Sequence, residues 1–356
     1  MPLAPAHLNT HSDSLHVPEA PVGVSDMLGR PLRDLRISVT DRCNFRCTYC
    51  MPREVFGPEH AFLKTTELLS FEEIIRVARI FVRAGVSKLR ITGGEPLLRP
   101  NLPSLIQSLS LLPGVTDVAL TTNGSVLERL ASDLKKAGLN RLTVSLDALD
   151  ETIFQKLSDT QVPVETVLRG IEQAHGLGFA PIKVNVVVKR GVNETEIVPL
   201  ARHFARPGFV LRFIEYMDVG NTNGWRLDDV VPAAEILERL SEFAPLEALT
   251  ANYPGETAKR YRFKRSGSEI GIIASVSAPF CSNCTRARIS ANGKLHTCLF
   301  SEAGTDLRSH LRDGSDDEVL KEVIRSAWAG RKDRYSEIRS SLSQTPQKTE
   351  MSVLGG

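Results

Sequence analysis

The strongest constraint on the fold is a repeated alternation of short strand-like segments with intervals long enough for a helix. Six such segments follow one another: LRISVT from Leu35, KLRIT from Lys88, DVALTT from Asp117, RLTVSL from Arg141, IKVNVVV from Ile182 and VLRFIEY from Val210. The alternation predicts repeated βα units with a parallel sheet. In the first interval, Ser70 and Glu73 form a capping-box pattern ahead of an apolar run, which predicts a helix start. Further helices are expected from near Asn101, Val126, Val164, Asn193 and Pro232.

One face of these strands is polar. Because successive side chains of a strand point to opposite faces, the following residues share one face: Arg36, Ser38, Thr40, Arg90, Thr92, Thr121, Asn123, Thr143, Ser145, Asp147, Lys183 and Asn185. A closed eight-stranded barrel fills its interior with apolar layers, so a polar inner face favours a wider barrel with a ligand in its lumen. The alternative is that some of these residues face solvent at a sheet edge. The predicted fold class is α/β, an incomplete (βα)6 TIM-like barrel.

The βα rhythm stops near residue 245, and the segments that follow favour a strand-rich region with a helix near residues 316–329. This predicts four parts: a disordered N-terminal extension (1–30), the partial barrel (31–244), a C-terminal region (245–340) and a flexible tail (341–356). The C-terminal region contains three cysteines that are expected to carry a metal cluster, as argued below. The tail ends in Gly355 and Gly356. Composition alone indicates a mobile end, and the opposing interpretation is that two slim glycines enter the barrel.

The balance of charge limits the partners. The chain has 44 basic and 42 acidic side chains and a net charge of +2, so it lacks the basic field of non-specific nucleic-acid binders. No apolar run approaches the roughly 20 residues that cross a bilayer. The first residues match neither a secretion signal nor a transit peptide. We therefore expect a cytoplasmic protein without nucleic-acid or membrane partners.

All six cysteines fall in two groups of three, Cys43, Cys47, Cys50 and Cys281, Cys284, Cys298. Odd numbers of thiols do not pair internally, whereas three thiolates hold a metal centre and leave one coordination position open. The first group follows the first predicted strand, where catalytic residues of βα barrels collect. Soft thiolates select zinc or iron-sulfur centres. A zinc site is the alternative for each group, and His296 is a candidate fourth ligand for the second.

A set of basic residues surrounds the predicted lumen. Arg286 and Arg288 follow the second cysteine pair and point to the same side of an extended segment, as two guanidinium forks suited to phosphate or nucleobase acceptors. With Arg36, Arg90 and Lys183 they make five cations for one polyanionic substrate. For each cation taken singly, ordinary surface charge is the alternative.

The spacing CxxxCxYC from Cys43, followed by the glycine-rich turn from Gly93 to Pro96, resembles the radical S-adenosylmethionine superfamily. The resemblance implies that the three cysteines hold a 4Fe-4S cluster whose fourth iron binds S-adenosylmethionine. It also implies that the glycine turn approaches the methionyl part of that cofactor. The second cysteine group is then an auxiliary 4Fe-4S cluster.

Within that superfamily, the chain from Leu35 onward resembles the GTP 3',8-cyclase family. The motifs that carry the resemblance are LRISVTDRCNFRCTYCMP, KLRITGGEPLLR, LTTNG, VSLDAL, KVNVVVKRGVN, FIEYMDVG, CSNCTRARIS with Cys298, and the terminal Gly-Gly. The resemblance implies cofactor contacts from Tyr49, Gly94, Ser145 and Met217. It implies GTP contacts from Arg36, Arg90, Thr121, Lys183, Arg286 and Arg288, and catalytic roles for Arg286, Arg288, Gly355 and Gly356. Arg212 is left out, because strand alternation places it opposite Met217.

The resemblance implies a reaction in which S-adenosylmethionine is cleaved reductively and a 5'-deoxyadenosyl radical removes the hydrogen at C3' of GTP. Bonding of C3' to C8 then gives 3',8-cyclo-7,8-dihydro-GTP, in the first step of molybdenum cofactor biosynthesis. The implied partners are a flavodoxin- or ferredoxin-type electron donor and, downstream, cyclic pyranopterin monophosphate synthase, with a homodimer by analogy. Two rivals are a radical enzyme acting on peptides and a non-catalytic iron-sulfur or zinc protein.

Overall fold

A computed structural model describes residues 23–342 and 346–355, and its centre is a sheet of 12 strands in the order β12-β11-β10-β1-β2-β3-β4-β5-β6-β9-β8-β7. The strands are β1 (Asp34–Ser38), β2 (Lys88–Thr92), β3 (Asp117–Thr122), β4 (Arg141–Ser145), β5 (Ile182–Val188), β6 (Phe209–Glu215), β7 (Leu246–Leu249), β8 (Lys259–Phe263), β9 (Glu269–Ile273), β10 (Arg286–Ile289), β11 (Lys294–His296) and β12 (Thr305–Asp306). The helices are α1 (Phe71–Arg83), α2 (Leu102–Ser110), α3 (Leu127–Lys136), α4 (Glu151–Ser158), α5 (Val164–Gly176), α6 (Ile197–Phe204), α7 (Ala233–Phe243), α8 (Arg308–Arg312), α9 (Asp317–Ala329), α10 (Tyr335–Ile338) and α11 (Met351–Leu354).

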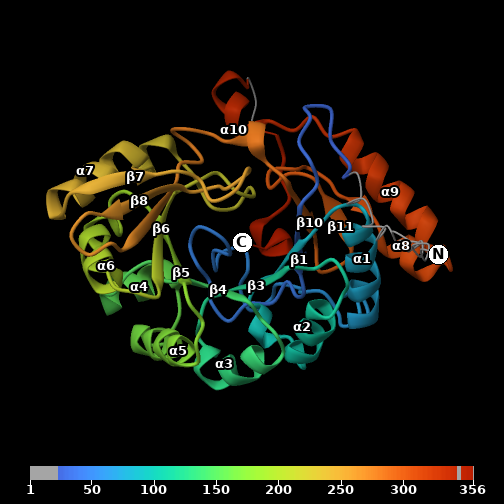
Figure 1. Cartoon of the computed structure of the whole chain (residues 1–356), viewed down its shortest axis with the longest axis horizontal. Coiled ribbons are helices and arrows are strands. Elements are labelled where there is room, and N and C mark those ends of the chain that lie inside the picture. The colour runs from blue at the N-terminus through green and yellow to red at the C-terminus, as the bar shows by residue number, and fades with distance from the viewer. Residues whose placement is uncertain (1–22, 343–345, 356) are drawn as a thin grey trace, which may run out of the picture.

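The six predicted strands, β1 to β6, pair in chain order and are all parallel. The sheet curves around a central space with helices α1 to α7 on its outside (Figure 1). The barrel does not close on itself. Instead β10 pairs with the free edge of β1, and β9 pairs with the free edge of β6. The prediction of an incomplete βα barrel is confirmed, and the strand-rich C-terminal region extends both ends of the same sheet.

Strand alternation separates the two faces of the barrel wall. Leu35 and Ile37 are buried in the apolar core between β1 and the outer helices. Arg36, between them in the sequence, lies in register with Arg90 of β2 and Arg288 of β10. Residues in register on neighbouring strands project from the same face of a sheet. The pairing therefore brings three arginines from distant parts of the chain together on the inner wall.

The outer helices follow local signals. The Ser70 side chain caps α1 by accepting a hydrogen bond from the backbone N–H of Glu73. The Glu73 carboxylate in turn accepts a hydrogen bond from the Ser70 N–H at 2.7 Å. The helix then buries Ile74, Val77 and Phe81 against the sheet. Helix α4 is absent from the sequence-based expectations and is capped by Asp150. Across the residues that the structure describes, none of the helices has the length and apolar character to span a bilayer.

The N-terminal boundary differs from the expectation of a disordered segment over residues 1–30. Residues 1–22 lie outside the described part of the chain, but residues 23–30 pack against the fold. Arg30 forms a buried ion pair with Asp26 at 2.6 Å and donates to the carbonyl of Cys281 at 2.8 Å. Cys281 is 251 positions away from Arg30 in the chain, so no local sequence pattern predicts this contact.

Candidate active site

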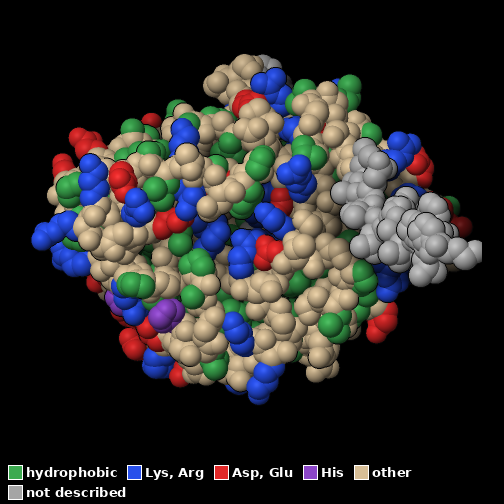
Figure 2. Space-filling view, in the orientation of Figure 1, with side chains coloured by type: hydrophobic (Ala, Val, Ile, Leu, Met, Phe, Trp, Pro, Cys, Tyr) green, Lys and Arg blue, Asp and Glu red, His purple; other side chains and the backbone are tan. Residues whose placement is uncertain are grey.

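A cavity of about 340 Å³ lies inside the barrel, and all six cysteines line it. So do the candidate cofactor residues Tyr49, Gly94, Ser145 and Met217 and the candidate substrate residues Arg36, Arg90, Thr121, Lys183, Arg286 and Arg288. Lys and Arg side chains gather in the central hollow of the molecule (Figure 2). Tertiary structure thus brings both cysteine groups and the predicted cations into one space. The role of each residue there is a proposal, taken up below.

The first cysteine group is in the loop after β1, at the carboxyl end of the parallel strands. Burial raises the pKa of Cys43 to about 11 and that of Cys50 to about 12. These thiols are therefore protonated in the metal-free chain at neutral pH, and metal binding has to displace their protons. The thiols of Cys43, Cys47 and Cys50 face the same cavity, which fits a shared iron-sulfur cluster with an open apex.

The glycine-rich turn after β2 packs directly on this cysteine loop. A Cβ atom on Gly94 would lie 2.3 Å from the carbonyl oxygen of Arg42, and one on Gly93 would lie 2.5 Å from that of Thr40. Gly93 also has φ of +150°, a conformation that favours glycine. In this chain the glycines therefore allow the turn to approach the cysteine-loop backbone. The family resemblance had implied only that this turn approaches the cofactor; the close contact with the cysteine-loop backbone comes from the structure.

Glu95 holds the same turn in place through three hydrogen bonds. Its carboxylate accepts from the Thr122 hydroxyl at 2.7 Å and from the backbone N–H groups of Asn123 and Leu97 at 2.7 and 3.0 Å. Burial raises the pKa of Glu95 to about 7 despite these three bonds. The contacts join the ends of β2 and β3 and fix the Gly93 and Gly94 backbone next to the cysteine loop.

Tyr49 and Asp147 form a second positioning pair. The Tyr49 hydroxyl donates to Asp147 at 2.6 Å, and the other oxygen of Asp147 accepts from the backbone of Val187 at 2.8 Å. Burial raises the pKa of Asp147 to about 6, and burial followed by the Asp147 charge raises that of Tyr49. This pair connects the cysteine loop to the ends of β4 and β5, beside Ser145.

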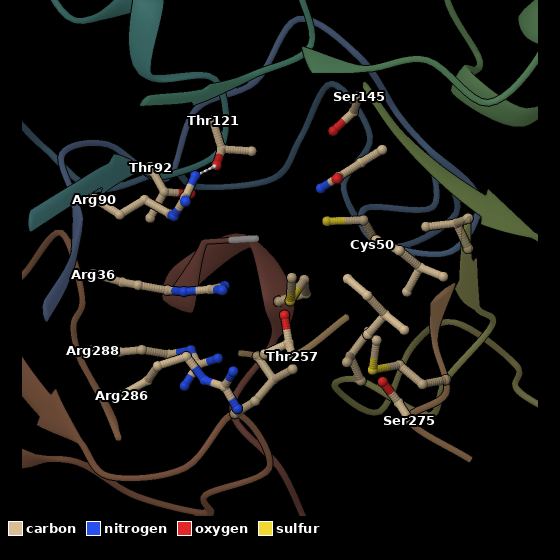
Figure 3. A pocket seen from close by; sticks show the side chains of 18 of the residues that line it. Arg36, Cys50, Arg90, Thr92, Thr121, Ser145, Thr257, Ser275, Arg286 and Arg288 are labelled. Atoms are coloured by element: carbon tan, nitrogen blue, oxygen red, sulfur yellow. Dashed lines mark hydrogen bonds between the residues drawn. The ribbon is translucent and has the colours of Figure 1, made fainter. Parts of the chain in front are cut away.

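The inner wall carries several buried cations. Figure 3 shows four arginines extending toward the middle of the cavity, Arg36, Arg90, Arg286 and Arg288. Burial, followed by repulsion from neighbouring arginines, lowers the pKa of Arg36, and burial lowers those of Arg90 and Arg288 to about 10. The Nε atoms of Arg286 and Arg288 are buried without a hydrogen-bond partner among the described residues. Buried like charges and unused donors of this kind favour a bound anion.

Arg212 belongs to this set, which corrects the sequence analysis. It lies in register with Asn185 and donates to the Asn185 side chain at 2.9 Å, and both residues line the cavity. Met217 lines the cavity too. Strand alternation does not reach Met217, because β6 ends at Glu215 and Met217 lies beyond the regular strand. Burial and then the charge of Arg90 lower the pKa of Arg212 to about 9.

The second cysteine group lies around β10 and β11, the strands that extend the sheet from the free edge of β1. Burial raises the pKa of Cys284, but Arg286 and Arg331 outweigh this effect, and the pKa falls to about 6. The thiol of Cys284 accepts from Arg286 at 3.1 Å. His296 is not among the residues that line the cavity, and its Nδ1 lies 2.8 Å from the Ser301 hydroxyl. Cys281, Cys284 and Cys298 thus give the cavity a second group of three thiols, the number that leaves one coordination position of a metal centre open.

The described end of the tail is inside the barrel. Leu354 is fully buried, and Met351 lines the cavity. Gly355 has φ of +71°, and a Cβ there would lie 2.5 Å from the Thr92 side chain and 2.8 Å from the backbone nitrogen of Gly93. Only glycine fits this position without displacing its neighbours. Gly356 lies outside the described residues.

Known proteins with similar sequences cover nearly the whole chain. A relative named GTP 3',8-cyclase from Acidothermus cellulolyticus is 52% identical over 358 residues, covering 94% of this chain and 99% of the relative. A relative of the same name from Xanthomonas axonopodis pv. citri is 48% identical over 333 residues, with 94% and 99% coverage. The chain belongs to the GTP 3',8-cyclase family.

Family models and solved structures divide the chain further. The model for the radical SAM superfamily matches residues 37–204, and that for molybdenum cofactor synthesis C matches residues 209–337. Their junction precedes β6, about 40 residues before the point where the sequence rhythm changes. The crystal structure of Streptococcus suis SuiB bound to S-adenosylmethionine aligns with a TM-score of 0.56 at 17% identity, over 87% of this chain and 68% of that one. At this identity the likeness concerns the fold.

Several cavity residues escaped the sequence analysis. Thr257 and Ser275 line the cavity from the C-terminal region (Figure 3), and Tyr253 does so from the loop between β7 and β8. The ring of Tyr253 lies 3.5 Å from the ammonium of Lys88. None of these residues belongs to a metal-ligand spacing or to the alternating strands of the barrel. The only available signal was their membership of the region that follows the last βα unit.

Proposed function

We propose that this chain is a GTP 3',8-cyclase that converts GTP to 3',8-cyclo-7,8-dihydro-GTP, the first step of molybdenum cofactor biosynthesis. Membership of the family supports the activity. The observation that carries the proposal is the cavity itself, which is lined by buried cations and by two groups of three cysteines. A nucleoside triphosphate matches this distribution, because its phosphates suit the cations and its base can reach the second metal centre.

We propose that Cys43, Cys47 and Cys50 hold one 4Fe-4S cluster and that Cys281, Cys284 and Cys298 hold another. A cluster held by Cys43, Cys47 and Cys50 would supply the electron for reductive cleavage of S-adenosylmethionine, the chemistry needed to remove the hydrogen at C3' of GTP. Reconstitution should therefore give about eight iron atoms per chain. One firmly bound zinc ion at the second site would contradict that half of the assignment.

The chain's own residues would bind, orient and enclose the reactants. We assign cofactor contacts to Tyr49, Gly94, Ser145 and Met217, and GTP contacts to Arg36, Arg90, Thr121, Lys183, Arg286 and Arg288. Arg212 joins the second set because it lines the same cavity and is buried. Fixed donors around the triphosphate hold C3' in one position relative to the adenosyl fragment, and enclosure keeps water from the reacting carbon. We also assign catalytic roles to Arg286 and Arg288, which line the cavity and would favour closure of the new bond, and to Gly355 and Gly356 at the end of the tail.

Resemblance within the family leads us to propose further partners. These are a flavodoxin- or ferredoxin-type electron donor, cyclic pyranopterin monophosphate synthase as the consumer of the product, and a second copy of this chain in a homodimer. We also retain, as a proposal, a cytoplasmic location and a division of the chain near residue 245. The support for these statements is the sequence pattern and the shared family.

The deciding experiment is anaerobic incubation of the reconstituted protein with S-adenosylmethionine, a reductant and one nucleoside triphosphate at a time. GTP should give an isomer of GTP with a different retention time, whereas ATP, CTP and UTP should not. An enzyme acting on peptides would release 5'-deoxyadenosine without converting any nucleotide. A non-catalytic metal protein would release none. Arg265→Ala, which removes an exposed cation in the turn between β8 and β9, is the control for variants of cavity cations and should convert GTP like the unaltered protein.

A further inference from the structure

The C-terminal segment 346–355 needs anchors to remain in the barrel. Its helix, α11, has only 4 residues, and helices of this length are unstable in isolation. The end of the segment nevertheless packs tightly, with Leu354 fully buried and Gly355 against the turn after β2. In addition to this packing, the segment has polar side-chain contacts before α11, from Lys348 and Glu350.

Lys348 makes the strongest of these contacts. Its ammonium lies 2.7 Å from the Asp218 carboxylate and donates to the Asp218 carbonyl at 2.7 Å. The two side chains are 1% and 9% exposed, and the Tyr335 ring centre is 4.5 Å from the ammonium. A buried ammonium without a carboxylate is strongly unfavourable. Burial of Lys348 therefore requires the segment to meet the loop that contains Asp218.

Glu350 forms a second contact with the same loop. One carboxylate oxygen accepts from the backbone N–H of Asn221 at 3.0 Å, and the other accepts from the Thr222 hydroxyl at 3.0 Å. Gly220, just before these two residues, has φ of +65°, and a Cβ there would lie 2.2 Å from the Glu350 carboxylate. The absence of a side chain at Gly220 is what allows this approach.

The two loops that receive the segment both contribute to the active site. Asp218 directly follows Met217, which lines the cavity. The N–H of Thr349 donates to the carbonyl of Ser301 at 2.9 Å, three residues after Cys298. The docked segment thus contacts both the loop after β6 and the loop of the second cysteine group.

We propose that Lys348 is a positioning residue that latches the C-terminal segment onto the loop 218–222 and thereby holds Gly355 against the Gly93 turn during cyclisation. Glu350 and Gly220 complete the latch. The part of this inference that concerns cyclisation rests on the proposed function. The docking itself depends only on the contacts described above.

The test uses Lys348→Met in the full-length, reconstituted enzyme. Methionine retains most of the side-chain volume, and Asp218 keeps Arg339 at 2.7 Å, so the fold should survive. Hydrogen exchange of residues 349–355, followed by mass spectrometry, should become about tenfold faster or more. Lys332→Met, at an exposed position, is the matched control and should leave this exchange unchanged. Gly220→Ala should loosen the segment without altering charge, and Lys348→Arg should restore part of the protection.

The second measurement is the coupling between cleavage of S-adenosylmethionine and cyclisation of GTP. In Lys348→Met the ratio of cyclised product to 5'-deoxyadenosine should fall about tenfold, which corresponds to Gly355 being docked in only about one turnover in ten. Unchanged exchange in the 349–355 region would overturn the latch, and unchanged coupling despite faster exchange would overturn its positioning role. If the wild-type chain makes no cyclised product, the proposed function is wrong. The exchange rates then still decide whether Lys348 holds the segment.

Discussion

The charge of Lys183 should make GTP binding depend on pH near neutrality. Burial, followed by repulsion from Arg212, Arg141 and Arg90, lowers the pKa of Lys183 to about 7. Lys183 is therefore charged below pH 7 and loses its positive charge above it in the empty site. A bound triphosphate favours the charged form and moves the pKa back toward the ordinary lysine value of roughly 10.4. Binding then takes up a proton above pH 7, so affinity falls as pH rises.

The size of the effect follows from the titration of one group. Lys183 is about half charged at pH 7 and about 3% charged at pH 8.5, if its pKa in the complex stays above roughly 10. The dissociation constant for GTP should thus rise about 15-fold across this interval. The measurement is anaerobic calorimetric titration of the reconstituted enzyme with GTP, without S-adenosylmethionine, so that no turnover occurs.

Lys183→Arg is the matched control, because a guanidinium keeps its charge across this range. The control retains the titration of the nucleotide itself and of all other groups. Its pH profile should be nearly flat, and the difference between the two profiles belongs to Lys183. Parallel profiles for the two proteins would refute the argument, whether because Lys183 has an ordinary pKa or because it does not meet the phosphates.

Three further predictions concern the same cavity. Replacing Arg212 with Gln should weaken GTP binding by about one to two decades, since a charge-assisted contact is worth roughly 1.5 to 3 kcal/mol, and calorimetry against Arg265→Ala checks it. In the double variant Arg286→Ala, Arg288→Ala, GTP turnover should fall by at least one to two decades, while binding of S-adenosylmethionine is retained. Normal cyclisation by this variant would show that neither arginine is needed for the reaction. Deleting Gly355 and Gly356 should leave iron content and GTP affinity intact but suppress cyclised product, and a single-turnover assay that finds the full rate would remove the tail from the mechanism.

Local patterns in the sequence were sufficient for the barrel and most of its contents. Hydrophobic runs separated by helix-length intervals predicted β1 to β6, and a capping box located the start of α1 at Ser70. The alternation of side chains along each strand predicted that Arg36, Arg90 and Lys183 share the inner face of the barrel, and all three line the cavity. These features are readable because strand and helix periods act over a few residues. Helix α4 escaped because it is short and has only two buried apolar side chains, Phe154 and Leu157.

Other features were decided by tertiary structure. Arg212 was misplaced because alternation was carried past the end of β6, and the packing of residues 23–30 depends on partners near residue 281. The tail reads as mobile from its composition, yet Lys348 is buried because Asp218 is 130 positions earlier in the chain and close in space. Sequence alone determined which chemical groups this protein has and which strand faces carry them. Only the folded chain determined which groups meet, because burial and pairing of charges depend on neighbours that the local sequence does not contain.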